Sequence, residues 1–387
     1  MIRVILLIDC SSEFDRRLLR GIMRYSKENG SWLFYRMPSS LRSGSDREKL
    51  VLDWAKEWKA DAVIGRWDED KVEMLSVLDI PVVLQNYRHR SAVHSNLTGD
   101  YFGTGKMAAR FFIRKKFRNF AYFGVRDIVW SEERHSGFRE EIEHHGYQCH
   151  SFLAQPLERE SEIREAVRNW LEELPKPVAL FSCDDAHALF ITETCRIANI
   201  HIPGEISLLG VDNDELLCEI SDPPISSIEL DVEEGGYMTC KMLHERILSG
   251  NRNPFSMVIK PNGIIQRKST QKYDIDDPYI ERIIDYMEEH YASDITIDRL
   301  LEIVPLSRRS LELRFKKGTG NTPYQFLIEC RLQHFSHLLL TTKKPVYEIA
   351  YEVGFKDGSN YSRIFHKFFG CSPLSWAVRT LQAKNAH

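Results

Sequence analysis

The sequence predicts an α/β domain of two lobes followed by an all-α domain with two helix–turn–helix units. Short aliphatic strands and amphipathic helical stretches alternate over about the first 265 residues, a pattern typical of parallel sheets covered by helices on both faces. The remaining residues show only helical patterns, and a pair of helices joined by a turn occurs there twice, about fifty residues apart. The predicted boundaries are a two-lobed domain at 1–265, a polar linker at 266–277 and a helical domain at 278–387.

Composition is typical of a globular protein of the cytoplasm. A length of 387 residues corresponds to two to four domains at roughly 100–200 residues each. No apolar run approaches the roughly 18–20 residues that would span a bilayer. The N-terminal run MIRVILLIDC is too short for a secretory signal and predicts a buried strand. The eight cysteines are scattered without paired spacing, which indicates reduced thiols. We therefore expect a cytoplasmic protein without membrane contact.

Charge is distributed unevenly along the chain. The net charge of −4 is the balance of 52 basic and 56 acidic residues. Residues 306–387 carry 13 Lys and Arg against 5 Asp and Glu, whereas residues 276–305 carry 2 against 9. A basic end on an acidic body is expected where one region of a protein contacts phosphate and the rest does not. The charge gradient therefore predicts nucleic-acid binding by the C-terminal end.

The first domain is expected to consist of βαβ units. Sequential strand–helix–strand units of this period form right-handed crossovers and a parallel sheet, and about 265 residues are too many for one compact open sheet. Two lobes are therefore predicted. The predicted strands are 3–8, 62–64, 81–84, 120–123, 178–181 and 206–211, and the predicted helices are 13–28, 102–115, 131–145, 159–173, 185–198 and 232–248.

Acidic residues and an arginine follow several of these strands. Ligands of open parallel sheets bind beyond the carboxyl ends of the strands, so we expect these side chains to form a site. Carboxylates accept hydrogen bonds from adjacent hydroxyl groups and a guanidinium donates to them, which suits a polyol, and aromatic rings can stack on a sugar. The alternative is that each Asp only caps the helix that follows it. The residues concerned are Asp9, Arg66, Asp68, Asp184, Asp185 and Asp212, with Phe14 and Trp67 as the aromatic side chains.

Motifs along residues 1–265 also resemble the sugar-sensing domain of LacI-type repressors. The resemblance implies effector contacts by Arg134, Asp184 and Asp212. The chain departs from that family in having Asp184 in place of the usual Asn and no helix–turn–helix ahead of the first strand, so DNA binding must lie elsewhere. The motifs are Asp100-Tyr-Phe-Gly-Thr-Gly, Asn119-Phe-Ala-Tyr-Phe-Gly, Arg134-His-Ser-Gly-Phe-Arg, Cys183-Asp-Asp-Ala, Ile202-Pro and Leu208-Leu-Gly-Val-Asp-Asn.

The helical domain is predicted to begin with an amphipathic helix at 278–291. The first helix–turn–helix unit follows, with a helix at 295–303 capped by Asp294 and a second helix at 307–317 capped by Ser307. A helix at 323–340 joins this unit to the next, and at 1.5 Å per residue it spans roughly 27 Å. A spacer of that length can place two recognition helices in successive major grooves, roughly 34 Å apart.

The second unit is predicted to consist of a helix at 346–352 and a recognition helix at 358–369. In the first recognition helix Leu311 and Phe315 face inward; in the second, Tyr361, Ile364, Phe365 and Phe368 do so. The residues expected to project outward are Arg308, Arg309, Glu312 and Arg314 in the first helix and Ser359, Asn360, Ser362, Arg363 and Lys367 in the second.

This region resembles the AraC-type DNA-binding domain. The stretch from 349 to 373 reads IAYEVGFKDGSNYSRIFHKFFGCSP, and the first unit matches through SRRSLELRFK at 307–316. The resemblance implies base contacts by outward residues of both recognition helices, whereas Leu313 occupies a position that is polar in some relatives. The residues implied are Arg309 and Glu312 in the first unit and Ser359, Asn360 and Arg363 in the second, with Arg308 and Lys367 beside them.

A LacI-type sensor ahead of an AraC-type pair is the layout of regulators of xylose operons. It implies a transcriptional regulator whose partners are double-stranded operator DNA, a small sugar effector such as xylose or another pentose, a second copy of the chain in a homodimer and, as a further candidate, RNA polymerase. A different sugar, or repression instead of activation, stays open as an alternative. A sugar-processing enzyme with a DNA-binding appendage is the rival class, but no nucleophile–base pair, HExxH or paired metal cysteines occur in the sequence. We expect no catalysis, no cofactor and no metal.

Overall fold

The computed structural model divides the chain into two compact units, Met1–Lys272 and Tyr273–His387. It describes all residues except 31, 37–46, 68, 86–87, 156–159, 272–276, 343, 357–359 and 379–387. No helix in the described part is long and apolar enough to cross a membrane. All eight cysteines are free thiols.

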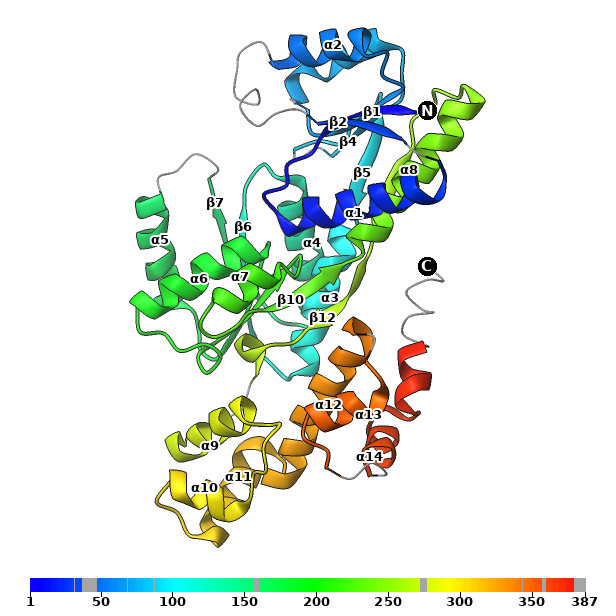
Figure 1. Ribbon diagram of the computed structural model, residues 1–387. Helices are drawn as coiled ribbons and strands as arrows, with labels where there is room; N and C mark the ends of the chain where they lie inside the picture. The colour runs from blue at the N-terminus through cyan, green and yellow to red at the C-terminus, as the bar shows by residue number, and fades with distance from the viewer. Residues whose placement is uncertain are drawn as a thin grey trace. The chain divides into compact units, whose positions relative to one another are not determined.

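The first unit contains two six-stranded sheets (Figure 1). In the first sheet the strand order is β11-β5-β4-β3-β1-β2, and every pairing is parallel. Helices cover its faces, so the central strands are buried along their length and are rich in Val, Ile and Leu. The strands are β1 (Arg3–Leu7), β2 (Leu33–Arg36), β3 (Ala62–Gly65), β4 (Val82–Leu84), β5 (Ser95–Gly99) and β11 (Ser256–Ile259).

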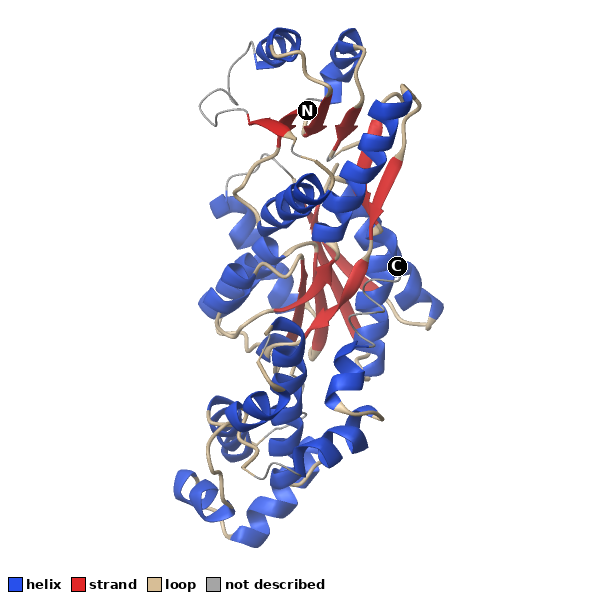
Figure 2. Ribbon diagram, turned by 45° about the vertical axis from the view of Figure 1, so that its right-hand side comes forward, coloured by secondary structure: helices blue, strands red, loops and turns tan. Residues whose placement is uncertain are grey.

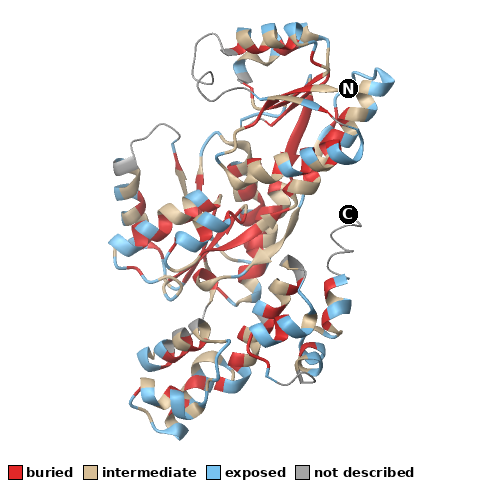
Figure 3. Cartoon of the chain, in the orientation of Figure 1, coloured by how far each residue is buried: buried red, intermediate tan, exposed pale blue. Residues whose placement is uncertain are grey.

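The second sheet has the order β12-β10-β9-β8-β6-β7, and only its edge strand β12 is antiparallel. In Figure 3 its central strands are red along most of their length, in agreement with the fully buried runs of β8 and β9. The strands are β6 (Asn119–Val125), β7 (Cys149–Ala154), β8 (Val178–Ser182), β9 (Ile206–Val211), β10 (Ser226–Leu230) and β12 (Pro261–Ile265).

Two helix pairs in this unit pack at backbone distance through glycine. A Cβ on Gly21 of α1 would lie 1.8 Å from the carbonyl oxygen of Glu233 in α8, and one on Gly105 of α3 would lie 2.1 Å from that of Arg134 in α4. Larger side chains would force each pair apart. Figure 2 shows the helices flanking the strands. The helices are α1 (Glu13–Glu28), α2 (Arg47–Glu57), η2 (Glu69–Leu78), α3 (Tyr101–Arg114), α4 (Val129–His144), α5 (Glu160–Glu173), α6 (Asp185–Ile197), α7 (Glu215–Ile220), α8 (Val232–Ser249) and η3 (Lys268–Thr270).

The second unit has two small hydrophobic cores connected by one long helix. One core is formed by α9, α10, α11 and the first half of α12, and the other by the second half of α12 with α13, α14 and the residues after it. A capping box at Thr322 and Gln325 fixes the start of α12. The helices are α9 (Pro278–Glu289), α10 (Ile297–Ile303), α11 (Arg308–Thr319), α12 (Pro323–Thr341), α13 (Val346–Glu352) and α14 (Asn360–Phe369).

The structure corrects three predictions about local structure. The predicted linker begins too early, because Ser269 and Thr270 are fully buried in the first unit. Asp294 does not cap the helix at 295–303: α10 is capped by Thr296, while Asp294 pairs with Lys356 at 2.7 Å. The side chain of Phe368, predicted to face inward, is 51% exposed.

The residues after α14 pack against Phe365 and Phe369 rather than against Phe368. Trp376 packs against Phe365 and Phe369, with ring centroids 5.9 Å and 5.2 Å away. Phe365 and Phe369, four residues apart, share the helix face that Trp376 covers. The ring of Phe368 contacts that of Phe369, with centroids 5.0 Å apart, but has no such cover and stays exposed.

Candidate functional site

A cavity of about 240 Å³ lies where the loops after strands of both sheets converge. In the first sheet β1 neighbours both β2 and β3, and in the second β6 neighbours both β7 and β8, so the strand order reverses at β1 and at β6. Ligands of such sheets bind at these reversal points. The volume is below the range of roughly 300–1,000 Å³ typical of drug-sized ligands, which indicates a small ligand. The lining residues are Ser11, Ser12, Phe14, Arg66, Gln85, Tyr101, Trp130, Arg134, Asp184 and Asp212.

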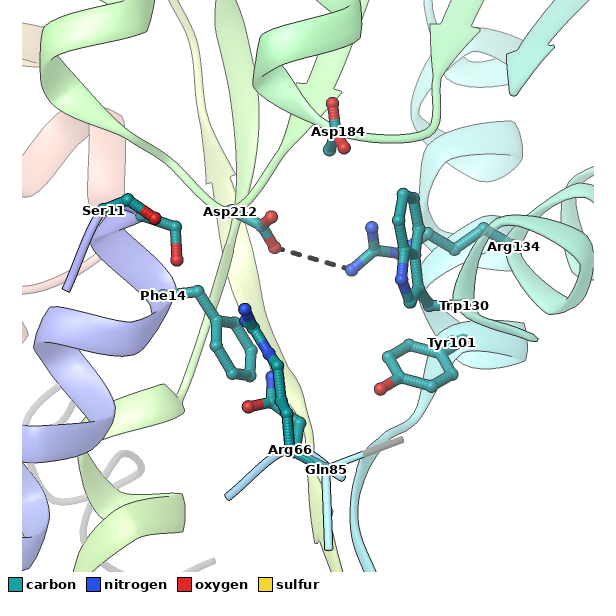
Figure 4. Close-up of a pocket in the computed structure, with 10 residues that line it drawn as sticks. Ser11, Phe14, Arg66, Gln85, Tyr101, Trp130, Arg134, Asp184 and Asp212 are labelled. Atoms are coloured by element: carbon teal, nitrogen blue, oxygen red, sulfur yellow. Dashed lines mark hydrogen bonds and ion pairs between the residues drawn. The ribbon is translucent and has the colours of Figure 1, made fainter. Parts of the chain in front are cut away.

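The lining residues come from both lobes of the unit (Figure 4). Ser11 and Ser12 follow β1, Arg66 follows β3 and Gln85 follows β4, all in the first sheet. Across the cavity Trp130 and Arg134 lie on α4, and the two aspartates follow β8 and β9 of the second sheet. A ligand in this cavity would therefore contact both lobes at once.

Arg134 and Asp212 form the polar centre of the cavity. The Arg134 side chain is 4% exposed and lies 3.5 Å from the Asp212 carboxylate, a distance at which the ion pair is stretched. The guanidinium also donates to the carbonyl oxygen of Cys183 and lies over the rings of Tyr101 and Trp130, 5.5 Å from each centroid. These contacts fix the orientation of the guanidinium while leaving it available to a ligand oxygen.

Burial and nearby charges control the ionisation of the two aspartates. Burial raises the pKa of Asp212 to about 6, although the positive charge of Arg134 opposes the rise. Burial also raises the pKa of Asp184, but the charge and hydrogen bonds of His187 outweigh it and lower that pKa overall. The ring of His187 lies 2.7 Å from Asp184. The cavity thus holds one fully ionised carboxylate and one that titrates near neutral pH.

Among the described residues that line the cavity, Gln85 and Arg134 each have a buried polar atom, Oε1 and Nε respectively, for which the structure gives no hydrogen-bond partner. Both atoms are buried, and an unsatisfied buried polar group costs roughly 1–3 kcal/mol. A ligand hydroxyl that donated to Gln85 or accepted from Arg134 would remove this cost. On the opposite side Arg66 is held in place by an ion pair of 2.8 Å with the fully buried Asp15.

The structure brings together five of the nine residues that the sequence placed in the effector site: Phe14, Arg66, Arg134, Asp184 and Asp212. Asp185 does not line the cavity; it is buried and accepts from the hydroxyl of Ser227 at 2.7 Å. Asp184 also caps α6, accepting from the His187 N–H at 2.7 Å, so one residue both caps the helix and lines the cavity. Asp9 does not line the cavity; its carboxylate accepts from the backbone of Ser11 at 3.2 Å, and it is the serines after it that line the cavity. Asp68 lies outside the described residues.

One aromatic residue predicted for the site lies elsewhere, and several lining residues were not predicted. Trp67 is 5% exposed in the core of the first lobe, where its indole N–H donates to the carbonyl of Lys71, and it cannot reach a ligand. Trp130 lines the cavity instead. Gln85 directly follows a predicted strand. It would have been identified if amide side chains at strand ends had been considered together with the acidic residues and the arginine. The residues that were not predicted are Ser11, Ser12, Gln85, Tyr101 and Trp130.

One cluster with metal-ligand chemistry touches this site. Cys183, Asp184 and His187 place ligand atoms within 4.8 Å of one another. The Asp184 carboxylate already accepts from the backbone and pairs with the ring of His187, so the helix cap and the ion pair account for the arrangement.

In the second unit the recognition helices present basic side chains to solvent. Arg309 is exposed, and Arg308 is exposed as well but pairs with Glu312 at 3.2 Å. Arg314, predicted to project outward, instead pairs with Asp277 at 2.5 Å. Leu311 and Phe315 are fully buried, which confirms that they face the core.

On α14 the exposed residues include Arg363 and Lys367, while Phe365 is fully buried. Ser359 and the side chain of Asn360 lie outside the described part of the chain. At 1.5 Å per residue the 19 residues of α12 span roughly 28 Å. The two helix–turn–helix units, α10–α11 and α13–α14, are therefore joined by a rigid spacer comparable in length to one helical turn of DNA.

Comparison with known families agrees with the two units. Residues 109–270 match the periplasmic binding protein-like domain and residues 300–379 match a helix-turn-helix domain. The chain is 26% identical to the xylose operon regulatory protein of Escherichia coli K12, over 97% of this chain and 96% of that protein. It is 24% identical to the protein of the same name from Haemophilus influenzae, over 97% of this chain and 98% of that protein.

Solved structures support the same fold. The structure of the xylose-binding transcription activator XylR matches with a TM-score of 0.66 and 23% identity over 97% of both chains. A periplasmic binding protein/LacI transcriptional regulator from Alkaliphilus metalliredigens matches with a TM-score of 0.57 and 18% identity over 70% of this chain and 99% of that chain.

The relatives that span the whole chain are transcriptional regulators and not enzymes, which confirms the expected absence of catalysis. Over 25% of this chain and 35% of that protein, the chain is 33% identical to the transcriptional activator RhaS of Enterobacter sp.. The chain is a DNA-binding transcriptional regulator, a periplasmic binding protein-like domain followed by a double helix–turn–helix domain, and it resembles the xylose operon regulatory proteins along nearly its whole length.

Proposed function

We propose that the cavity of the first unit binds a monosaccharide effector, a pentose such as xylose. The observation that carries the proposal is the pairing of Arg134 with Asp212 in a small cavity that also holds Asp184 and Arg66. Carboxylates accept from adjacent hydroxyl groups, guanidinium groups donate to them, and Trp130 or Phe14 offers a face to the sugar ring. The names of the relatives support the choice of a pentose, because they refer to xylose, and two matching structures are described with D-xylulofuranose and with ribose.

The sugar acts by holding the two lobes together. Its contacts come from the first sheet through Arg66 and Gln85 and from the second through Arg134, Asp184 and Asp212. A ligand can shift a conformational equilibrium only by its differential affinity for the two forms. Because a sugar that bridges both sides makes all its contacts only when the lobes are closed, it favours the closed form.

The output of this change is operator binding by the second unit. In this proposal the chain works in the cytoplasm as a homodimer, whose four helix–turn–helix units contact repeated half-sites of double-stranded DNA, and it activates transcription through RNA polymerase. Arg309 and Arg363 read bases, with Arg308, Glu312, Ser359 and Asn360 beside them, and Lys367 contacts phosphate. Repression by the sugar-free form is the alternative, and transcription from the operator with and without sugar separates the two.

A thermal-shift screen of monosaccharides tests the effector assignment. The full chain is melted alone and with D-xylose, L-arabinose, D-ribose, D-glucose and D-galactose. A ligand at a hundred times its Kd stabilises the native state by about 2.7 kcal/mol, so a true effector raises Tm by several degrees. We expect the largest shift with a pentose. A shift with hexoses alone would replace the pentose with another sugar, and no shift with any of them would contradict the proposed class.

Sugar affinity is expected to rise with pH between 5 and 7. The pKa of Asp212 is about 6 in the sugar-free protein. Hydroxyl groups that donate to this carboxylate favour its ionised form, so binding must compete with protonation at low pH. At one pH unit below the pKa only about a tenth of the carboxylate is ionised, so Kd at pH 5 should be up to about tenfold weaker than at pH 7.

Calorimetric titrations at pH 5, 6, 7 and 8 measure this dependence. The affinity should level off above pH 7, and Asp212→Asn should bind more weakly but with little change in Kd over the same range. A Kd that improves as pH falls would show that the protonated acid binds the sugar instead.

A further inference from the structure

The segment by which the chain leaves the first unit is held there by buried side chains. We call residues Arg267–Thr270 the exit clamp. Ser269 donates to the carbonyl of Leu208 at 2.6 Å and accepts from the backbone of Ser226 at 2.8 Å. The hydroxyl groups of Thr270 and Ser226 are 2.7 Å apart. A chain segment secured in this way is a fixed part of the sensor unit, although its composition is that of a linker.

Arg267 connects the exit clamp to three separate parts of the second lobe. Its guanidinium donates to the Oδ1 atom of Asn213 at 3.0 Å, to the carbonyl of Ile225 at 3.0 Å and to the carboxylate of Glu219 at 2.6 Å. The side chain is 12% exposed, whereas that of Glu219 is 60% exposed. The contact with Glu219 therefore faces solvent, while the contact with Asn213 points into the protein.

Asn213 is the neighbour of the cavity residue Asp212. Both residues have positive φ, 99° for Asp212 and 48° for Asn213, so the chain turns sharply there. The backbone N–H of Asn213 donates to the hydroxyl of Ser227 at 3.0 Å, and that hydroxyl donates to the buried Asp185 at 2.7 Å. Any movement of this turn that a ligand induces through Asp212 therefore also displaces the side chain of Asn213, which Arg267 contacts.

A second element of the cavity reaches the exit clamp at its other end. Helix α3 begins at Tyr101, whose ring lines the cavity, and ends next to Lys115. The Lys115 ammonium donates to the carbonyl of Thr270 at 2.9 Å. Because α3 is a continuous helix, a shift of the helix at Tyr101 is carried to Thr270. Both ends of the exit clamp are thus tied to elements that touch the cavity.

We propose that the Arg267–Asn213 hydrogen bond transmits effector occupancy at Asp212 to the segment leading into the DNA-binding unit. Arg267 is a positioning residue in this scheme, because it does not line the cavity and acts through Asn213. The inference rests on the proposed function, since it requires that a sugar contact Asp212. Thermodynamic linkage then requires that sugar change operator affinity and that operator change sugar affinity by the same factor, typically about 5–150-fold.

The test measures that factor in the full chain and in Arg267→Ala. Operator affinity is determined with and without saturating D-xylose, and D-xylose affinity is determined with and without operator. In Arg267→Ala we expect each affinity, taken alone, to stay within about threefold of the parent. The factor by which D-xylose changes operator affinity should fall to less than about twofold. The factor by which operator changes D-xylose affinity should fall equally. A loss of folding alone would lower the affinities and would not abolish the factor selectively.

Asn213→Gly breaks the same hydrogen bond from the other end, and glycine adopts the positive φ at this position without strain. It should show the same loss of coupling, and the double variant should lose no more than either single one. Glu219→Gln and Lys268→Ala serve as matched controls, because they alter charge on the same segment or its solvent-side partner and leave the Asn213 contact in place. Both should retain the parental factor.

The outcomes separate the two proposals. If D-xylose changes the DNA affinity of the parent, and changes that of Arg267→Ala and Asn213→Gly by the same factor, the role of the exit clamp is contradicted. The effector assignment then still stands. A parent that binds none of the screened monosaccharides contradicts the effector assignment and the role of the exit clamp with it. If the screen finds another sugar, that sugar replaces D-xylose in the same test. Loss of coupling in the Glu219→Gln control as well would overturn the assignment to the Asn213 contact.

Discussion

Asp212→Asn is expected to weaken monosaccharide binding by about 1–3 kcal/mol, or roughly 5–150-fold in Kd. The substitution keeps the shape of the side chain, and Asn tolerates the φ of 99° at this position. It removes the charge that faces Arg134, whose side chain is only 4% exposed. The bound sugar loses a charged acceptor, and the buried guanidinium loses its ionic partner in the complex. Isothermal titration of both proteins with the sugar found by the screen measures the loss.

A surface aspartate of the same unit provides the control. Asp222 pairs with Arg196 at 3.3 Å, and both side chains are 73% exposed, so Asp222→Asn should leave sugar affinity unchanged. Operator affinity in the absence of sugar should stay close to that of the parent in both variants. If Asp212→Asn bound sugar as tightly as the parent did, the cavity would not be the effector site.

The sequence predicted the parts of this site that follow strongly patterned strands. β8 and β9 are fully buried and mostly apolar, so the pattern alone places Asp184 and Asp212 at strand ends. β5 has the sequence SNLTG, and its five residues are all buried although most are polar or small, so hydrophobic pattern did not reveal it. Tyr101, which follows that strand, was missed for the same reason. The hydrophobic pattern of a sequence reveals a strand whose buried side chains are apolar. It does not reveal a strand whose buried side chains are polar and form hydrogen bonds.

The exit clamp shows the same limit at the level of domains. Residues 266–277 are polar and lack periodicity, which predicts a linker, yet Ser269 and Thr270 are fully buried. Their burial depends on partners such as Ser226 and Lys115, which are 43 or more residues away along the chain. The composition of a segment indicates whether the segment can be exposed to solvent. It does not show that buried partners elsewhere in the fold will accept its hydrogen bonds.

The second unit was predicted more completely because its signals are local. α13 has the predicted bounds, and Ser307 caps α11 by accepting from the backbone of Ser310 at 3.3 Å. Helix caps and contacts between residues four apart involve residues that are close in the sequence. They can therefore be predicted directly from it. Two local predictions failed. Thr296, not Asp294, caps α10, and Phe368 is exposed, whereas the neighbouring Phe369 packs against Trp376 beyond the end of the helix.

Replacing the exposed arginines of the two recognition helices should distinguish base reading from phosphate contact. We expect Arg363→Ala and Arg309→Ala each to cost about 1–3 kcal/mol on the operator and to relax the preference at one base position. An arginine at such a position can donate two hydrogen bonds to guanine O6 and N7, whereas a phosphate contact carries no sequence information. Lys367→Ala, on the same helix as Arg363, should instead weaken binding to all sequences alike and lower the salt slope by about one.

Fluorescence titrations on operator and on random DNA at three or more salt concentrations measure both quantities for each variant. In the arginine variants, the ratio of the affinity for operator DNA to the affinity for random DNA should fall. In Lys367→Ala, both affinities should fall by the same factor, so the ratio should not change. Sugar affinity without DNA should be unchanged in all three, because the substitutions lie in the second unit and the cavity in the first. Equal losses on operator and random DNA for both arginine variants would assign them to phosphate. Base reading would then have to come from other exposed positions of the two helices, such as Glu312 on α11 or Ser362 on α14.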